Sequence, residues 1–226
     1  MSNPESFIDE VTDEVRRDRL YAGFRKYGWI GVLLVLGIVA GAGYNEWSKA
    51  QSANRAQAFG DAVLDGLDLG APEDRRAAIA AAPADGAQLA IRQLLLASDP
   101  VESKAATLEA LAVLAADATQ PAVYRDLAVV RQMTIAGADL PLADRRAALE
   151  AISAPGRPYR TLALEQLAYL QIEEGKPDAA IVALSALMQD QEAPSGLRSR
   201  AAQMITALGG EVPAAAPAVS DVVQDG

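Results

Sequence analysis

Carboxylates are the main groups in this chain that could do chemistry, since 226 residues include 30 Asp+Glu, 20 Lys+Arg and neither His nor Cys. Paired carboxylates can act as a general acid and a general base. Here they recur at helical spacing, which is typical of solvated helix faces, and no nucleophile or phosphate-binding loop accompanies them. The absence of imidazole and thiol groups excludes a Ser-His-Asp triad, a cysteine nucleophile and His- or Cys-ligated metals. We therefore expect no enzyme activity, no metal site and no cofactor.

One row of side chains is a better candidate for binding than for catalysis. Leu162, Glu165, Tyr169 and Glu173 follow one another at the spacing of a helix face. In a tetratricopeptide hairpin this row points toward the concave surface, where it would suit a peptide with basic and apolar side chains. An ordinary solvated face that carries acids is the competing interpretation. The net charge of −10 argues against nucleic acid as a partner, and no small-molecule substrate is expected.

The elements that position this row are all predicted to be helices. Proline and glycine punctuate the chain beyond Trp47, and no run of alternating apolar and polar residues indicates a strand. Asp99-Pro100, Pro121, Pro141 and Pro177 mark helix starts. We expect helices near residues 45–67, 72–82, 84–97, 100–116, 122–136, 141–152, 159–174, 177–190 and 195–208.

A weak internal repeat predicts how these helices are arranged. Tyr124-Arg-Asp-Leu-Ala128 recurs 35 residues later as Tyr159-Arg-Thr-Leu-Ala163, close to the ~34-residue period of tetratricopeptide repeats. The clearest unit runs from Thr161 to about Glu192, with Gly175 in its turn. Small Ala168 and Ala180 would let its two helices nest, while leucines fill the core. The arginine of each Tyr-Arg pair is expected to meet a nearby acid.

An apolar segment precedes this domain. No charged residue occurs from Tyr27 to Asn45, and a helix of that length can cross a ~30 Å hydrocarbon layer. Aromatic residues lie at both ends, as is typical of membrane interfaces. Arginine and lysine are concentrated before the segment, so the positive-inside rule places residues 1–26 in the cytoplasm. We expect a bacterial inner-membrane protein with one span and its C-terminal domain in the periplasm.

A cleaved signal peptide is the main alternative, because Ala40-Gly41-Ala42 resembles a cleavage site. The long acidic leader argues for an uncleaved anchor. Within the span, Gly37 and Gly41 share one helix face, on which a second helix could pack closely. The predicted organisation is a cytoplasmic amphipathic leader (1–26), a transmembrane helix (27–45), a periplasmic helical domain (46–208) and a disordered tail (209–226).

Three stretches of sequence carry a resemblance to a known family: residues 7–20, residues 25–28 and Gly196-Leu-Arg-Ser-Arg-Ala-Ala-Gln-Met-Ile205. With the single span between them, they resemble the tetratricopeptide-like inner-membrane proteins related to YfgM, the ancillary subunit of the SecYEG translocon. The resemblance implies a membrane-anchored protein-protein interaction module that associates with translocon subunits, periplasmic chaperones or unfolded clients and assists exported proteins. It supplies no catalytic residues. The alternative function is a structural or assembly subunit of another bacterial inner-membrane complex.

Overall fold

The computed structural model describes the backbone of residues 4–213, and the side chains of Arg25 and of residues 29–213. Contacts divide the chain into two compact units, Met1–Ala58 and Phe59–Gly226. The described residues form nine α-helices and one short 3-10 helix, with no strand among them. The fold class of these residues is therefore all-α, as predicted.

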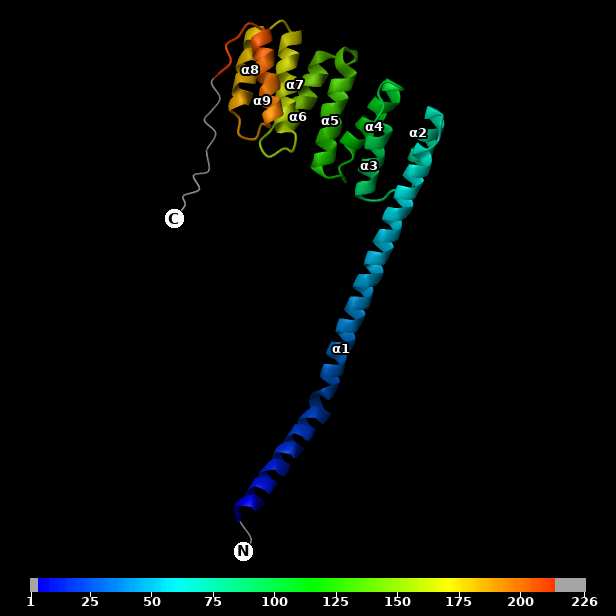
Figure 1. Cartoon of the computed structure of the whole chain (residues 1–226), viewed down its shortest axis with the longest axis vertical. Coiled ribbons are helices and arrows are strands. Elements are labelled where there is room, and N and C mark those ends of the chain that lie inside the picture. Colours follow the sequence, from blue (N-terminus) through cyan, green and yellow to red (C-terminus); the bar gives the residue numbers. More distant parts are fainter. Residues whose placement is uncertain (1–3, 214–226) are drawn as a thin grey trace. The chain divides into compact units, whose positions relative to one another are not determined.

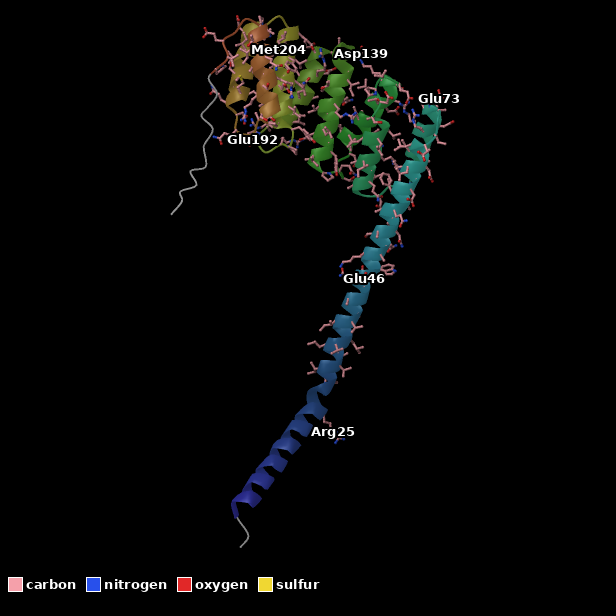
Figure 2. The ribbon with its side chains drawn as sticks, in the orientation of Figure 1. Arg25, Glu46, Glu73, Asp139, Glu192 and Met204 are labelled. Carbon is pink, nitrogen blue, oxygen red and sulfur yellow. The ribbon has the colours of Figure 1, made fainter. Side chains whose placement is uncertain are left out.

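The first helix, α1 (Pro4–Leu67), runs without a break through the segments expected to be the leader, the span and the 45–67 helix. No proline interrupts it, because the next one after Pro4 is Pro72. Its large apolar side chains between Trp29 and Val39 are all exposed (Figure 2). This stretch is long and apolar enough to fit a membrane span or a signal sequence. The side chains of the predicted leader other than Arg25, and residues 214–226 of the predicted tail, lie outside the described residues.

Eight more α-helices follow α1, and their order is seen in Figure 1. Proline opens two of them directly, and Pro121, Pro141 and Pro194 immediately precede three others. The helix predictions are confirmed to within a few residues for all but one start. The helices are α2 (Pro72–Ala81), α3 (Ala87–Leu96), α4 (Lys104–Ala116), α5 (Ala122–Ala136), α6 (Leu142–Ile152), α7 (Arg160–Glu173), α8 (Pro177–Gln189) and α9 (Ser195–Ala207).

The start of α4 corrects the sequence analysis, which placed the first helical residue at Pro100. Asp99 instead accepts a hydrogen bond from the backbone N–H of Glu102 (3.0 Å), which closes a turn before the helix. Ser103 is the N-cap, and its hydroxyl accepts a hydrogen bond from the N–H of Ala106 (3.4 Å). Two capping residues compete here, and the later one begins the helix. The 3-10 helix η1 (Gly137–Asp139), between α5 and α6, has no counterpart in the predictions.

Within the second unit, each helix packs mainly against its neighbours in sequence, and α5 and α9 also contact α7. The core is correspondingly divided into small clusters along the stack. Ala168 and Ala180 are fully buried, so the expectation that small residues let α7 and α8 nest is confirmed. Stability built from neighbouring layers is typical of helical-repeat architecture.

Polar side chains join helices that lie about one hairpin apart in sequence. We call these contacts the polar ties: each links a side chain to a carboxylate or backbone carbonyl between 27 and 35 residues away. Arginine supplies most of the donors, because its planar group can bridge helices through several N–H bonds. The ties are Arg75–Glu102, Arg131–Ala97, Lys104–Ala136, Arg145–Glu173, Arg157–Asp126, Arg160–Asp190 and Arg200–Glu165.

Glycine ends two helices of the stack with positive φ angles, +72° at Gly175 and +82° at Gly209. After α7, the N–H of Gly175 donates to Ile172 (2.9 Å) and that of Lys176 donates to Gln171 (2.9 Å). This pair of hydrogen bonds satisfies carbonyls that the helix end would otherwise leave open. The predicted turn at Gly175 is confirmed.

Candidate functional site

The predicted row on α7 contains a buried ion pair. Glu165 is only 2% exposed and receives two hydrogen bonds from Arg200 of α9, at 2.9 and 2.8 Å. The Tyr169 hydroxyl donates a third bond to the same carboxylate (2.9 Å). Burial, followed by the interaction with Glu165, raises the pKa of Tyr169 to about 12. Glu165 therefore fastens α7 to α9 and is already saturated by donors from within the protein.

Glu173, at the far end of the row, is also engaged within the protein. Arg145 of α6 donates to it in a bidentate arrangement, with 3.0 Å between Nη1 and Oε1. The Arg145 side chain is 6% exposed, whereas that of Glu173 is 47% exposed. The hydrogen bond from Arg145 lowers the pKa of the Glu173 carboxyl. Glu173 thus tethers α7 to α6 while one side of it faces solvent.

Leu162 completes the predicted row and is half-buried against Leu187 and Leu197. Tyr169 and Glu173 contribute to a small pocket of about 90 Å³ between α5, α6 and α7. The structure therefore brings Glu165 and Tyr169 together, and it pairs both acids of the row with arginines. That a peptide binds along this face stays a prediction.

The opposite side of α7 borders a larger opening that the sequence analysis did not single out. This opening, which we call the α6–α8 groove, has a volume of about 400 Å³ and is lined by residues of α6, α7 and α8. Such a volume falls within the range of protein ligand sites, roughly 300–1,000 Å³. Its floor is apolar and consists of Leu164, Leu167, Ala168, Ala183, Ala186 and Leu187.

Charged side chains line the rim of the α6–α8 groove. Arg146 of α6 donates to Glu174 and lies 4.0 Å from Glu150. Arg160, just inside α7, is held by Asp190 and donates to Glu192 at 2.8 Å. This arginine belongs to one of the two Tyr-Arg repeats, so its expected pairing with an acid is confirmed. Arg125, in the other repeat, has no ion pair with a described residue.

Gln171 of α7 also lines the α6–α8 groove. Its Oε1 atom is buried and accepts no hydrogen bond from a described residue. An amide oxygen removed from water without a donor carries a free-energy penalty. Leu164, Leu167 and Gln171 lie at helical spacing along α7, which is the one sequence signal that could have indicated this face. Pattern alone assigned the leucines to the core.

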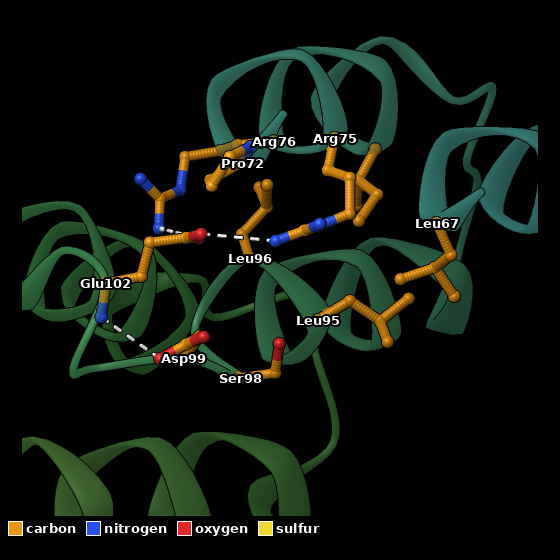
Figure 3. A pocket seen from close by; sticks show the side chains of 10 residues that line it. Leu67, Pro72, Arg75, Arg76, Leu95, Leu96, Ser98, Asp99 and Glu102 are labelled. Carbon is orange, nitrogen blue, oxygen red and sulfur yellow. Dashed lines mark hydrogen bonds and ion pairs between the residues drawn. The ribbon is translucent and has the colours of Figure 1, made fainter. Parts of the chain in front are cut away.

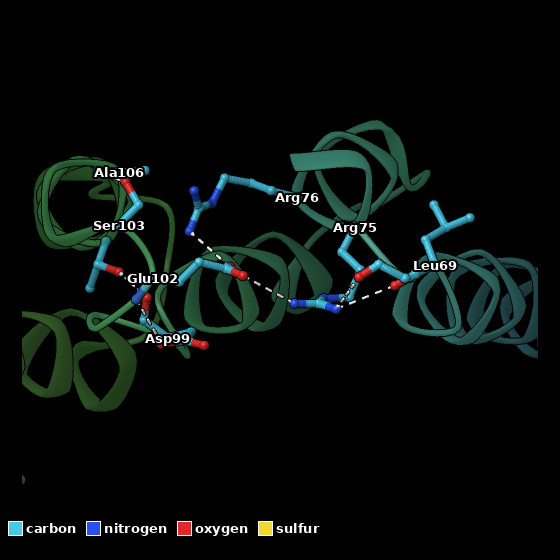
Figure 4. A network of polar contacts seen from close by, with 9 residues as sticks. Leu69, Arg75, Arg76, Asp99, Glu102, Ser103 and Ala106 are labelled. Atoms are coloured by element: carbon cyan, nitrogen blue, oxygen red, sulfur yellow. Dashed lines mark hydrogen bonds and ion pairs between the residues drawn. The ribbon is translucent and has the colours of Figure 1, made fainter. Parts of the chain in front are cut away.

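A third pocket, of about 110 Å³, lies among α2, α3 and the turn before α4 (Figure 3). Glu102 spans its rim by accepting from Arg75 at 3.1 Å and lying 3.8 Å from Arg76. Arg75 also donates to the carbonyls of Leu69 and Gly70 (Figure 4). The arginines over this pocket are engaged in joining α2 to its neighbours, so its polar groups are accounted for by the fold.

The glycine pair in α1 is open in the structure. A Cβ atom added at Gly37 or Gly41 would meet no atom within 4 Å, and the two positions are one helical turn apart. Packing of a second helix against them stays a prediction. No group of three or more His, Cys, Asp or Glu side chains that could hold a metal occurs among the residues whose side chains are described.

Comparison with known proteins does not assign the chain to a family. No protein family, no characterised protein and no solved structure matches it. Its function must therefore be argued from its own residues and geometry.

Proposed function

We propose that this chain is a membrane-anchored protein-protein interaction module of the bacterial inner membrane, with a tetratricopeptide-like stack of hairpins in the periplasm. The observation that carries the proposal is the series of polar ties, each spanning 27 to 35 residues. Their reach is close to the ~34-residue period of tetratricopeptide repeats. Stacked hairpins of this kind present long surfaces to other proteins.

Two further features support the anchored arrangement. The apolar stretch of α1 is fully exposed in the isolated chain, and a bilayer would cover it. Tyr44 and Trp47 lie close together at its C-terminal side, with ring centroids 6.1 Å apart, as suits a membrane interface. The basic residues that precede the span assign the N-terminus to the cytoplasm.

The partners we propose are subunits of the secretion translocon, periplasmic chaperones and the unfolded exported chains that both handle. The resemblance of the leader and of the α9 sequence to proteins related to YfgM supports this choice. The internally paired acids of α7 and the open α6–α8 groove are consistent with a binding role.

Mild detergent extraction of the tagged full-length protein, followed by mass spectrometry, tests the proposal. We expect translocon subunits and periplasmic folding factors to be enriched over an unrelated single-span control. Enrichment of a different membrane complex instead would favour the role of an assembly subunit.

Topology can be tested independently because the chain has no native cysteine. A single cysteine at Ser52 should react with a membrane-impermeant thiol reagent in cells permeabilised only at the outer membrane. A cysteine at Ser6 should be protected under the same conditions. The reverse pattern would overturn the proposed orientation.

A further inference from the structure

The α6–α8 groove combines an apolar floor with an acid on its rim that is open to an incoming cation. Both rim arginines are already neutralised, since Arg146 donates to Glu174 and Arg160 donates to Glu192 and Asp190. Glu150 is 58% exposed, and its nearest cation is at the 4.0 Å limit of an ion pair. The rim therefore offers more negative than positive charge to a binding partner.

The floor of the groove calls for apolar side chains and for a backbone. Leu164, Leu167 and Ala186 leave apolar surface open to solvent, and covering that surface is favourable. The buried carboxamide of Gln171 lies in the same groove without a donor to its oxygen. An extended peptide offers both N–H and C=O groups, so its backbone can pair with the carboxamide.

We propose that the α6–α8 groove binds an extended polypeptide segment that carries apolar side chains next to a basic one. Apolar side chains occupy the floor, Gln171 bonds the peptide backbone, and Glu150 pairs with the Lys or Arg. The inference rests on the proposed function and deepens it by naming a site and a partner chemistry. It places the site on the side of α7 opposite to the row of Glu165 and Tyr169.

A photocrosslinking experiment tests the site directly on the full-length protein in detergent. The probe is a short peptide rich in leucine and lysine, with a proline that keeps it extended and a central photoreactive phenylalanine. We expect mass spectrometry to locate crosslinks on 164–171 and 183–190. Crosslinks confined to α5, to α9 or to a second copy of the chain would overturn the inference.

Two matched pairs of variants separate shape from charge. Ala186→Lys fills the groove and adds a cation, and should weaken probe binding by at least about tenfold. Ala179→Lys makes the same change on α8 outside the groove, and should leave binding unchanged. Glu150→Lys should weaken binding about threefold, whereas Glu109→Lys, on exposed α4 surface, should not. Equal effects within either pair would overturn the assignment of the groove.

The failure of this inference can be told apart from failure of the proposed function. If Ala186→Lys loses probe crosslinking while the wild-type protein co-purifies no partner, the groove is a peptide site and the proposed function fails. If wild-type and Ala186→Lys proteins co-purify the same partners and crosslink the probe equally, the proposed function stands and the groove assignment fails. Circular dichroism confirms that each variant is folded before either comparison.

Discussion

The two sides of α7 treat charge and apolar surface in opposite ways. On the side facing α9 and α6, Glu165 and Glu173 are each held by an arginine from another helix. On the side facing the α6–α8 groove, Leu164 and Leu167 are only half-buried. Acids that looked available for a partner are used to hold the stack together, while leucines that looked like core line an open surface. In this domain, arginine-carboxylate pairs act as fasteners between layers, and the accessible binding surface is apolar.

The largest expected effect concerns the fastener between α7 and α9. Arg200→Leu leaves the Glu165 carboxylate buried with the Tyr169 hydroxyl as its remaining side-chain donor among the described residues. Removing one partner of a buried pair costs about 3 kcal/mol of unfolding free energy. Urea unfolding followed by circular dichroism measures this loss. Arg198→Leu, on the same helix and without an ion pair to a described residue, should change stability by less than about 0.5 kcal/mol. Equal losses would show that Arg200 acts only through its charge.

A smaller effect is expected at the turn that joins α7 to α8. Gly175 has φ +72°, a conformation that an L-residue rarely adopts, so Gly175→Ala should cost about 1 kcal/mol. Gly196→Ala is the matched control, because Gly196 lies in the first turn of α9 with open space around it. It should stabilise the protein by a few tenths of a kcal/mol. The same sign for both changes would contradict a backbone explanation.

The Glu173–Arg145 pair predicts a pH dependence. Because the hydrogen bond from Arg145 lowers the pKa of Glu173 in the folded state, the pair contributes stability above the carboxyl's unfolded pKa. That contribution disappears as the pH falls through the lowered, folded pKa. The difference in unfolding free energy between wild type and Glu173→Gln should therefore shrink as the pH is lowered from about 6 to about 3. A difference independent of pH would contradict this role for the carboxylate.

The smallest expected effect lies on the open side of α7. Ala186 is exposed on α8, so Ala186→Lys should change the unfolding free energy by less than about 0.5 kcal/mol. A thermal melt of the full-length protein measures the change. A loss as large as that from Arg200→Leu would mean that the groove is part of the core and not a binding surface.

Much of the fold could be predicted because proline and glycine mark helix ends locally. Pro141, Pro177 and Gly175 each lie at or next to the predicted boundary. The predicted start at Pro100 was wrong because Ser103 offers a competing cap, and a choice between two caps depends on how the turn packs. The helices predicted separately before residue 67 form one helix, because sequence periodicity does not show where a polar helix joins an apolar one.

The candidate site was harder to predict than the helices. Helical spacing correctly groups Glu165 with Tyr169, but it contains no information about Arg200, which approaches from 35 residues away. For the same reason the sequence could not show which acids have partners. The α6–α8 groove depends on the separation of α6 from α8, which is a property of stacking and is absent from the pattern of any single helix.

The polar ties limit how the length of this domain can change over generations. Each arginine finds its acceptor about one period along the chain, as Arg145 finds Glu173 and Arg200 finds Glu165. Duplication or loss of a whole period keeps donors opposite acceptors, because every layer then meets an equivalent neighbour. Insertion of half a period would turn arginines toward the wrong helices and leave buried carboxylates without cations. We therefore expect homologous chains to differ in length by whole hairpin pairs within the stack, and freely only beyond its ends.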